Sequence, residues 1–231
     1  MTRLVLFDID GTLLASGGVG RRAMEGALMV HFGTIGPTHY RYDGKTDKQI
    51  ARESMRMAGF SDADIDTRMQ ALLDDYLARL GHVVASGDHG VRVHLGIAEL
   101  LDALEARADV VLGLLTGNIA AGAALKLRAA GLAVERFRVG AFGSDHEHRP
   151  ALPAIAKRRA EELLGCGVQG EQLVIIGDTP ADVECGRGIG ARAVAVATGH
   201  FTTADLAAHE PHAVFEDFTD LDASLRAICD A

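Results

Sequence analysis

Two carboxylates one residue apart, Asp8 and Asp10, directly follow the apolar run 4–7 near the start of the 231-residue chain. Such a run predicts a strand buried on both faces, as in a parallel sheet. Because an unpaired carboxylate is costly in a dry interior, both should lie where the strand ends. Residues i and i+2 of a strand point the same way, so both carboxylates can face one site. A shared proton or a cation relieves their repulsion, and a divalent metal is the simplest prediction.

Two further apolar runs also end in polar residues, Thr116 and Asp178. The carboxyl ends of parallel strands meet at one edge of a sheet, so these residues are expected to converge on Asp8. Asp182 lies four residues after Asp178 and can share a face with it. Together the carboxylates form an oxygen-rich set that suits Mg²⁺.

Purely structural explanations exist for part of this pattern. Thr116 and Asn118 could serve only as helix caps. Thr179-Pro180 followed by Asp182 could simply begin a helix. Neither explanation accounts for Asp178 at the end of a buried strand.

The segment Asp8-Ile9-Asp10-Gly11-Thr12-Leu13 resembles the first motif of the haloacid dehalogenase-like hydrolase superfamily. Thr116 and Asp178 fit the second and fourth motifs of that superfamily, in the right order. A hairpin turn at Asp10-Gly11 is the alternative, but residues 12–20 lack the alternation of a returning strand.

The resemblance implies a role for each acidic residue. Asp8 would be the nucleophile that forms an aspartyl-phosphate, and Asp10 the general acid and base. Mg²⁺ would be held by Asp8, the main-chain carbonyl of Asp10 and Asp178, with Asp182 secondary. Relatives that cleave carbon–halogen or carbon–phosphorus bonds generally lack the second carboxylate, so its presence implies phosphoryl transfer.

The predicted phosphate-binding residues are Thr116, Gly117 and Asn118, because the N–H groups that follow Thr116 open a helix. The third motif of the superfamily supplies a basic residue that bridges nucleophile and phosphate. Arg149 is the preferred candidate, in a catalytic role, and Lys157 on the following helix is the alternative. Lys45 is the predicted contact to the leaving group, although an exposed loop lysine explains it equally well.

Strands and helices alternate from residue 96 onward, which predicts a Rossmann-like parallel sheet with helices on both faces. About eighty mostly helical residues separate the first strand from the next, far more than an ordinary connection contains. We therefore expect an α/β core formed by residues 1–15 and 93–231, with an inserted helical cap at 16–92. Cap helices are predicted at about 19–32, 46–58 and 61–80. Further core strands are predicted at 110–115, 137–142, 173–176, 193–196 and 213–215, and the core helices include 180–188 and 205–209.

The bulk composition argues against several classes of binding partner. A net charge of -9 with only 23 Lys and Arg residues argues against a nucleic-acid partner. Three widely separated cysteines argue against a disulfide framework and fit a reducing compartment, here the cytoplasm. No apolar run is long enough to span a bilayer, so no membrane partner is expected.

The sequence therefore predicts a cytoplasmic, Mg²⁺-dependent phosphatase that acts on a small phosphorylated metabolite and resembles the phosphoglycolate phosphatases. A phosphomutase of the β-phosphoglucomutase kind is the first alternative, because it would share all four motifs. A binding module without catalytic activity is the second, and the intact pair Asp8 and Asp10 argues against it.

Overall fold

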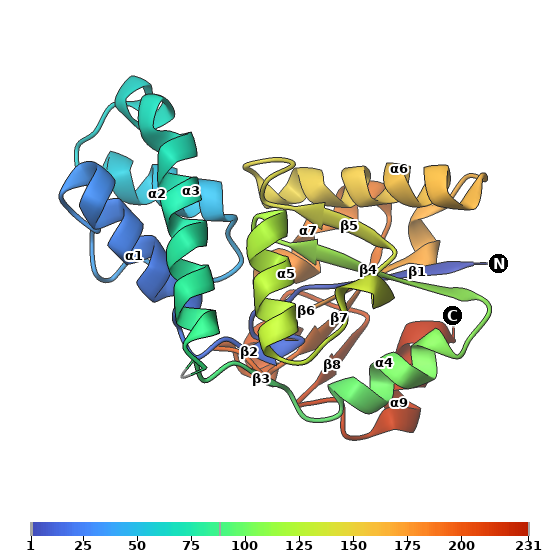
Figure 1. The fold of residues 1–231 in the computed structure, drawn as a ribbon. Coiled ribbons are helices and arrows are strands. Elements are labelled where there is room, and N and C mark those ends of the chain that lie inside the picture. The colour runs from blue at the N-terminus through green and yellow to red at the C-terminus, as the bar shows by residue number, and fades with distance from the viewer. Residues whose placement is uncertain (1, 88, 231) are drawn as a thin grey trace.

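The computed structural model describes residues 2–87 and 89–230. In this part of the chain a six-stranded sheet runs in the order β5-β4-β1-β6-β7-β8, and all neighbouring strands are parallel (Figure 1). The predicted parallel α/β sheet is therefore confirmed. Its strands are β1 (Arg3–Phe7), β4 (Val110–Thr116), β5 (Val139–Phe142), β6 (Leu173–Gly177), β7 (Arg192–Val196) and β8 (Ala213–Phe215).

Strand β1 lies at the centre of the sheet and pairs with β4 on one side and β6 on the other. Phe7, its last residue, is level with Leu114 and Ile176 of these two neighbours. The three strands therefore end within two residues of one another. This common edge is the place where open α/β sheets bind ligands.

Alternate residues of β1 belong to two different apolar cores. Val5 and Phe7 lie in the larger core, and Leu4 and Leu6 lie in the second. This division is what a strand buried on both faces requires. The larger core includes α4 (Ile97–Glu105), α5 (Ala120–Ala129) and α9 (Leu221–Cys229), while the second includes α6 (Leu152–Leu164) and Cys185 of α7 (Pro180–Cys185).

Helices α1 (Val19–Phe32), α2 (Asp47–Met57) and α3 (Asp62–Ala85) pack against one another to one side of the sheet (Figure 1). Two short strands, β2 (Leu14–Ala15) and β3 (Arg92–Val93), pair antiparallel where the chain enters and leaves these helices. Strands of two residues are too short to produce a sequence pattern, and they were not predicted. They lie beside the predicted domain boundaries, but the division into core and cap stays a prediction.

Several predicted element ends were wrong. Helix α3 continues through Gly81 to Ala85, and α7 ends at Cys185 before a separate turn at Arg187–Ile189. The third core strand begins at Val139, because residues 134–136 form a 3-10 turn just before it. The helix predicted at 205–209 is α8 (Thr203–Ala207). The helix begins two residues earlier than predicted, because Thr202 and Asp205 form a capping box. The prediction did not take this sequence signal into account.

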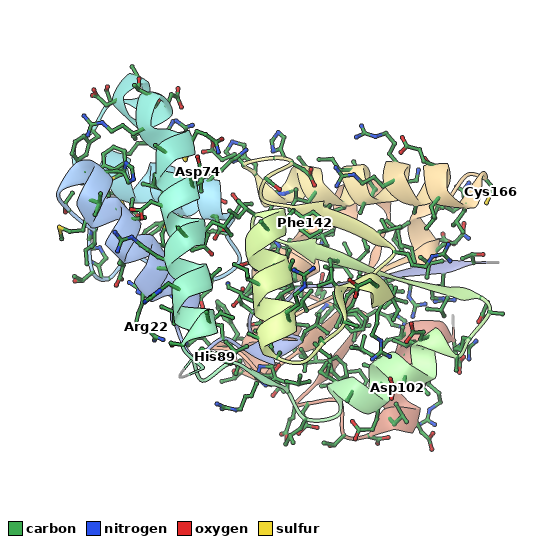
Figure 2. All side chains as sticks on the ribbon, in the orientation of Figure 1. Arg22, Asp74, His89, Asp102, Phe142 and Cys166 are labelled. Carbon is green, nitrogen blue, oxygen red and sulfur yellow. The ribbon has the colours of Figure 1, made fainter. Side chains whose placement is uncertain are left out.

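None of the helices in the described residues is long and apolar enough to cross a membrane. All three cysteines are free, as predicted, and Cys185 is buried. Cys166 is exposed, which is the opposite of the burial that its apolar character favours. It follows α6 at the end of the molecule opposite Arg22 and Asp74 (Figure 2).

Candidate active site

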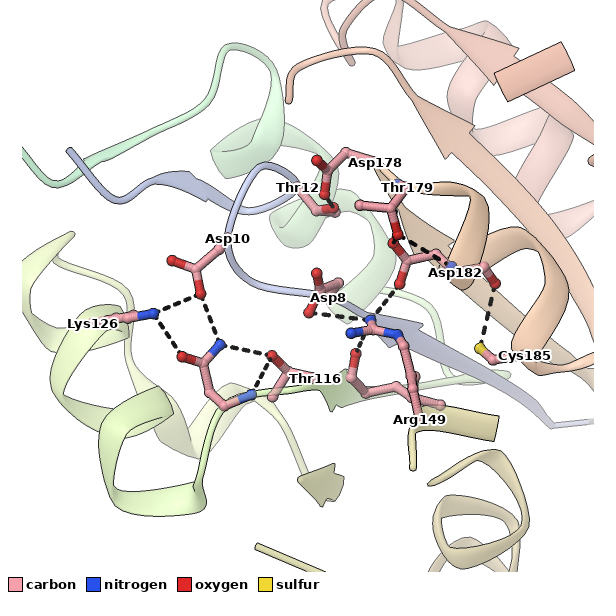
Figure 3. Close-up of polar contacts among 12 residues, drawn as sticks. Asp8, Asp10, Thr12, Thr116, Lys126, Arg149, Asp178, Thr179, Asp182 and Cys185 are labelled. Atoms are coloured by element: carbon pink, nitrogen blue, oxygen red, sulfur yellow. Dashed lines mark hydrogen bonds and ion pairs between the residues drawn. The ribbon is translucent and has the colours of Figure 1, made fainter. Parts of the chain in front are cut away.

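Asp8 lies at the centre of the site, immediately after β1. Its carboxylate is 6% exposed, and its Oδ1 lies 3.3 Å from Nη2 of Arg149 (Figure 3). Burial raises the pKa of Asp8, Arg149 lowers it, and the nearby carboxylates of Asp182 and Asp10 raise it, so that it reaches about 6. An opposing cation at this point would favour the ionised, nucleophilic form.

Asp10 belongs to a network of polar side chains on one side of Asp8 (Figure 3). Its Oδ2 accepts from Nζ of Lys126 at 2.7 Å and from Nδ2 of Asn118 at 2.8 Å. Its Oδ1 is buried and has no hydrogen-bond partner among the residues described. Burial raises the pKa of Asp10, but the attraction of Lys126 and the hydrogen bonds outweigh it and lower the pKa.

Asp178 lies on the other side of Asp8 and accepts from Oγ1 of Thr12 at 3.0 Å. Burial, followed by the charges of Asp182 and Asp8, raises the pKa of Asp178 well above its usual range. A Cβ atom at Gly199 would lie 1.8 Å from Oδ2 of Asp178, so only glycine lets the backbone approach this closely.

The carboxylates of Asp8, Asp178 and Asp182 each offer an oxygen within 4.8 Å of the others. So much buried negative charge is unfavourable without a cation. Oxygen ligands of this kind suit a hard divalent ion such as Mg²⁺. The residues present therefore fit the metal that the sequence predicts.

Asp182 differs from the other two carboxylates because both of its oxygens already accept hydrogen bonds from the protein. Oδ1 is bound by Nη2 of Arg149, and Oδ2 accepts from the backbone N of Thr179 at 3.0 Å and from its Oγ1 at 2.6 Å. Asp182 is therefore a poorer candidate for a metal ligand than Asp8 or Asp178. Its observed contacts instead hold the guanidinium of Arg149 beside Asp8.

Arg149 and Lys157, the two candidates for the bridging basic residue, lie in very different places. Arg149 is 3% exposed and donates to the carbonyl of Leu115 at 3.2 Å. Lys157 is a partly exposed residue of α6, and its Nζ lies 3.6 Å from Glu161. Of the two, Arg149 is the one near Asp8.

The backbone N–H groups after Thr116 are mostly occupied, contrary to the expectation that they are open to phosphate. The N–H of Asn118 donates to Oγ1 of Thr116 at 3.3 Å. The N–H of Ile119 donates to Asp47 at 2.8 Å, and that of Ala120 donates to Ser144 at 3.2 Å. The carbonyl of Gly117 accepts from the N–H of Asp47 at 2.8 Å. The hydroxyl hydrogen of Thr116 is therefore the better candidate for a phosphate contact.

A cavity of about 520 Å³ connects these groups and is lined by both the sheet edge and the helices α1–α3. Lys45 lines it, but its Nζ already pairs with Glu53 at 2.6 Å and lies 4.6 Å from the ring centre of Tyr40. The lining includes Asp8, Asp10, Thr116, Lys126, Arg149 and Asp178 at the sheet edge, with Arg21, Tyr42, Lys45, Asp47, Ile50 and Tyr76 from the other side.

Neither the role of Lys126 in the site nor the contact made by Asp47 was predicted from the sequence. Lys126 follows Ala123 by three residues and precedes Leu127, so it lies on the apolar face of its helix. A charge on that face was a readable signal, because a buried lysine requires a partner. The partner of Asp47 lies 72 residues away, and no local pattern indicates it.

Several known proteins are similar to this chain in sequence or in fold. A family model described as HAD-hydrolase-like matches residues 148–221, which include Arg149 and Asp178. The phosphoglycolate phosphatase of Rhodospirillum rubrum is 29% identical over 227 residues, which cover 96% of this chain and 90% of that protein. A hydrolase from Pseudomonas syringae has a similar fold, with a TM-score of 0.71 and 21% identity over 100% of both chains. The structure of CbbY from Rhodobacter sphaeroides in complex with phosphate has a TM-score of 0.64 and 20% identity, and 96% of each chain is covered.

Proposed function

We propose that the chain is a haloacid dehalogenase-like hydrolase, and specifically a phosphatase that hydrolyses a small phosphomonoester through Asp8. One observation carries the proposal. Asp8 lines the same cavity as Asp10, Arg149 and Asp178, and its carboxylate lies 3.3 Å from the buried guanidinium of Arg149. A nucleophile, an acid–base group and a cation thus surround one space.

We propose that Asp8, Asp178 and the main-chain carbonyl of Asp10 hold Mg²⁺. When bound, Mg²⁺ neutralises the charge of the carboxylates and of the phosphoryl oxygens. The crowding of Asp8 and Asp178 supports this proposal, because these carboxylates have too few protein cations near them.

In the first step an oxygen of Asp8 attacks phosphorus in line with the leaving oxygen. The bond between phosphorus and the leaving oxygen breaks while the bond to Asp8 forms. Asp10 donates a proton to the leaving oxygen. In the second step a water attacks phosphorus, Asp10 accepts its proton, and the bond to Asp8 breaks to release phosphate.

Arg149 and the hydroxyl of Thr116 stabilise the transferring phosphoryl group. Arg149 has a fixed position, because Asp182 and the carbonyl of Leu115 bind the same nitrogen. Thr116 already accepts from the side chain and backbone of Asn118, so its hydroxyl hydrogen is free to donate. Donors fixed in advance around developing charge are a large part of enzymatic rate enhancement.

The substrate class is the finer part of the proposal. The Rhodospirillum relative is a phosphoglycolate phosphatase, and we propose a short phosphorylated metabolite for this chain as well. The cavity of about 520 Å³ is large enough for such a ligand. We propose that residues 16–92 act as the cap that excludes water during the reaction.

The test is release of inorganic phosphate from a panel of phosphorylated acids and sugars, with Mg²⁺ and with a chelator. The Asp8→Asn variant should lose about a thousandfold or more of the turnover, because the nucleophile is removed. Asp74→Asn changes an exposed carboxylate of α3 and serves as the matched control. Full turnover by Asp8→Asn would refute the assignment of the nucleophile.

The same panel tests the phosphomutase alternative. A mutase returns the phosphoryl group to a sugar hydroxyl, so glucose 1-phosphate would become glucose 6-phosphate without release of phosphate. A phosphatase releases phosphate from every substrate that it turns over. In both cases acid-quenched protein should carry one phosphoryl group on Asp8.

A further inference from the structure

Lys126 is a buried cation that the proposed mechanism does not use. It lies on α5, its side chain is 5% exposed, and its neighbours on the helix face, Ala123 and Leu127, belong to the larger core. Its Nζ donates to Asp10 at 2.7 Å and to Oδ1 of Asn118 at 2.6 Å. A buried charge is retained at a cost, so these two contacts call for an explanation.

The contact with Asn118 fixes which way its amide points. Nζ of Lys126 is a donor only, so the amide oxygen must face it and the amide nitrogen must point away. That nitrogen donates to both Asp10 and Oγ1 of Thr116, each at 2.8 Å. Rotating the amide by half a turn would place the N–H groups of Asn118 against those of the Lys126 ammonium. Lys126 thereby sets the donors that reach two residues of the proposed active site.

The contact with Asp10 fixes the carboxylate itself. Both donors, Lys126 and Asn118, bind the same oxygen, Oδ2. Oδ1 is left without a partner among the described side chains. The orientation of the carboxylate is therefore set by the two donors that hold Oδ2.

Helix α1 approaches the ammonium of Lys126 closely at Gly20. A Cβ atom placed on Gly20 would lie 2.9 Å from Nζ of Lys126. The glycine thus lets α1 pack beside the ammonium.

We propose that Lys126 is a positioning residue. It orients Asp10, directly and through Asn118, so that Asp10 can transfer protons to and from the reacting oxygens. The proposal rests on the phosphatase function proposed above. Lys126 acts through Asp10 and does not itself contact the phosphoryl group. Its loss should therefore affect the steps that need Asp10 and spare the binding of substrate.

The first test compares two esters in the Lys126→Met variant, which keeps the length of the side chain and removes its charge. For an alkyl phosphate, kcat should fall about 10- to 100-fold with little change in KM, because misplaced catalytic groups cost rate of this order. For p-nitrophenyl phosphate the loss in the rate of the first step, measured as the burst of p-nitrophenol, should be much smaller than for the alkyl ester, because this leaving group needs little protonation. General damage to the fold would lower both rates alike.

The second test restores the cation from solution. Lys126→Ala should regain part of its alkyl-phosphatase rate when ethylammonium is added, and ethanol at the same concentration should have no effect. Lys157→Met, which changes a lysine on the surface of α6, is the matched control and should keep both rates. In the Asp10→Asn background, Lys126→Met should cause little further loss, since both variants then remove one function.

Equal losses on the two esters, or no loss on either, would overturn the proposal. A crystal structure of Lys126→Met gives a readout that does not depend on activity. It should show the amide of Asn118 rotated or the carboxylate of Asp10 turned, and unchanged side chains would also overturn the proposal. If the wild-type protein released no phosphate from either ester, the proposed function itself would fail, and the role of Lys126 with it.

Discussion

Asp178 and Asp182 show how two residues of one type, four positions apart, come to differ in their surroundings. Asp178 has a single side-chain donor, Thr12, and its charge is poorly compensated. Asp182 is bound by Arg149 and Thr179. The same substitution at the two positions should therefore have opposite effects on stability.

We expect Asp178→Asn to stabilise the metal-free protein, by about 1 kcal/mol, because it removes one negative charge from a crowded buried set. In the wild-type protein Mg²⁺ should raise Tm, since a ligand that binds only the folded state stabilises it. In Asp178→Asn this rise should be lost. Thermal unfolding with Mg²⁺ and with a chelator measures both effects, and a metal-induced rise that survives the substitution would contradict the assigned ligand.

Asp182→Asn should destabilise the protein by about 3–5 kcal/mol with or without Mg²⁺, because it leaves the buried Arg149 without its closest partner. Chemical denaturation with and without the metal gives the free energy of unfolding. A loss seen only when Mg²⁺ is present would instead support the metal role for Asp182 that the sequence first indicated.

Arg149 and Lys157 differ as sharply as the two aspartates do. Arg149→Met should lower kcat by about 100-fold or more, because it removes a fixed positive charge beside the nucleophile. Lys157→Met should keep kcat within about twofold, since a partly exposed helix pair contributes little. Steady-state kinetics on one substrate compares them, and a larger loss in Lys157→Met would reverse the assignment.

Site residues could be predicted from the sequence where a local pattern marked them. Asp8, Thr116 and Asp178 each end a run of apolar residues, and the parallel sheet brings those ends together. The pairing of Lys126 with Asp10 could not be predicted in this way, because the two residues are 116 positions apart in the chain. Contacts of that kind depend on how helices pack on the sheet, which short-range periodicity does not reveal.

At the scale of elements, helix ends depend on single glycines whose surroundings differ. Gly96 precedes α4 at φ 78°, and a Cβ atom there would lie 2.2 Å from the backbone of Phe218. Gly165 ends α6 at φ 67° and has nothing within 4 Å of a Cβ position. The first glycine has both a conformational and a steric requirement, and the second has only the conformational one.

We expect Gly165→Ala to cost about 1 kcal/mol, the strain of a left-handed conformation in a residue with a Cβ atom. Gly96→Ala should cost clearly more, about 3 kcal/mol, because the backbone of Phe218 must also move. Urea unfolding of the two variants measures the difference. Equal losses would show that residues 218–219 yield to the added methyl group.

Buried strands were predicted to within about two residues, because continuous apolar runs mark them clearly. Strands β2 and β3 and the start of α8 were missed or misplaced. The two short strands owe their position to pairing across 77 residues, which their sequence does not reveal. The start of α8 depends on the capping box of Thr202 and Asp205, which the sequence does contain.

At the scale of the whole molecule, the start of α2 holds the helices α1–α3 against the sheet edge. Oγ1 of Thr46 donates to the carbonyl of Glu147 at 2.6 Å, and Lys48 donates to the carbonyl of Ser144 at 3.1 Å. Nε of Arg52 pairs with the carboxylate of Glu147 at 2.6 Å. The side chains of Arg52 and Glu147 are only 16% and 21% exposed, so this ion pair is partly shielded from water.

The proposed cap should therefore open more often when the charge of Glu147 is removed. A charge-assisted pair of this kind contributes about 1 kcal/mol, which shifts a two-state equilibrium about fivefold. Because substrate is enclosed only in the closed form, Glu147→Gln should raise KM by up to about fivefold and leave kcat nearly unchanged. Limited proteolysis of the segment that joins α3 to β3 should become faster by a similar factor.

Glu161→Gln is the matched control for this prediction. It removes a carboxylate that contacts Lys157 and the backbone N–H of Val168, and both of these residues lie outside the proposed cap. It should leave KM and the cleavage rate unchanged. Arg52 keeps its contact with Asp66 at 2.7 Å in Glu147→Gln, so α2 itself should stay folded and Tm should fall only slightly. If Glu147→Gln matched its control in both KM and proteolysis, the backbone bonds of Thr46 and Asp47 alone would suffice to hold α2 against the sheet edge.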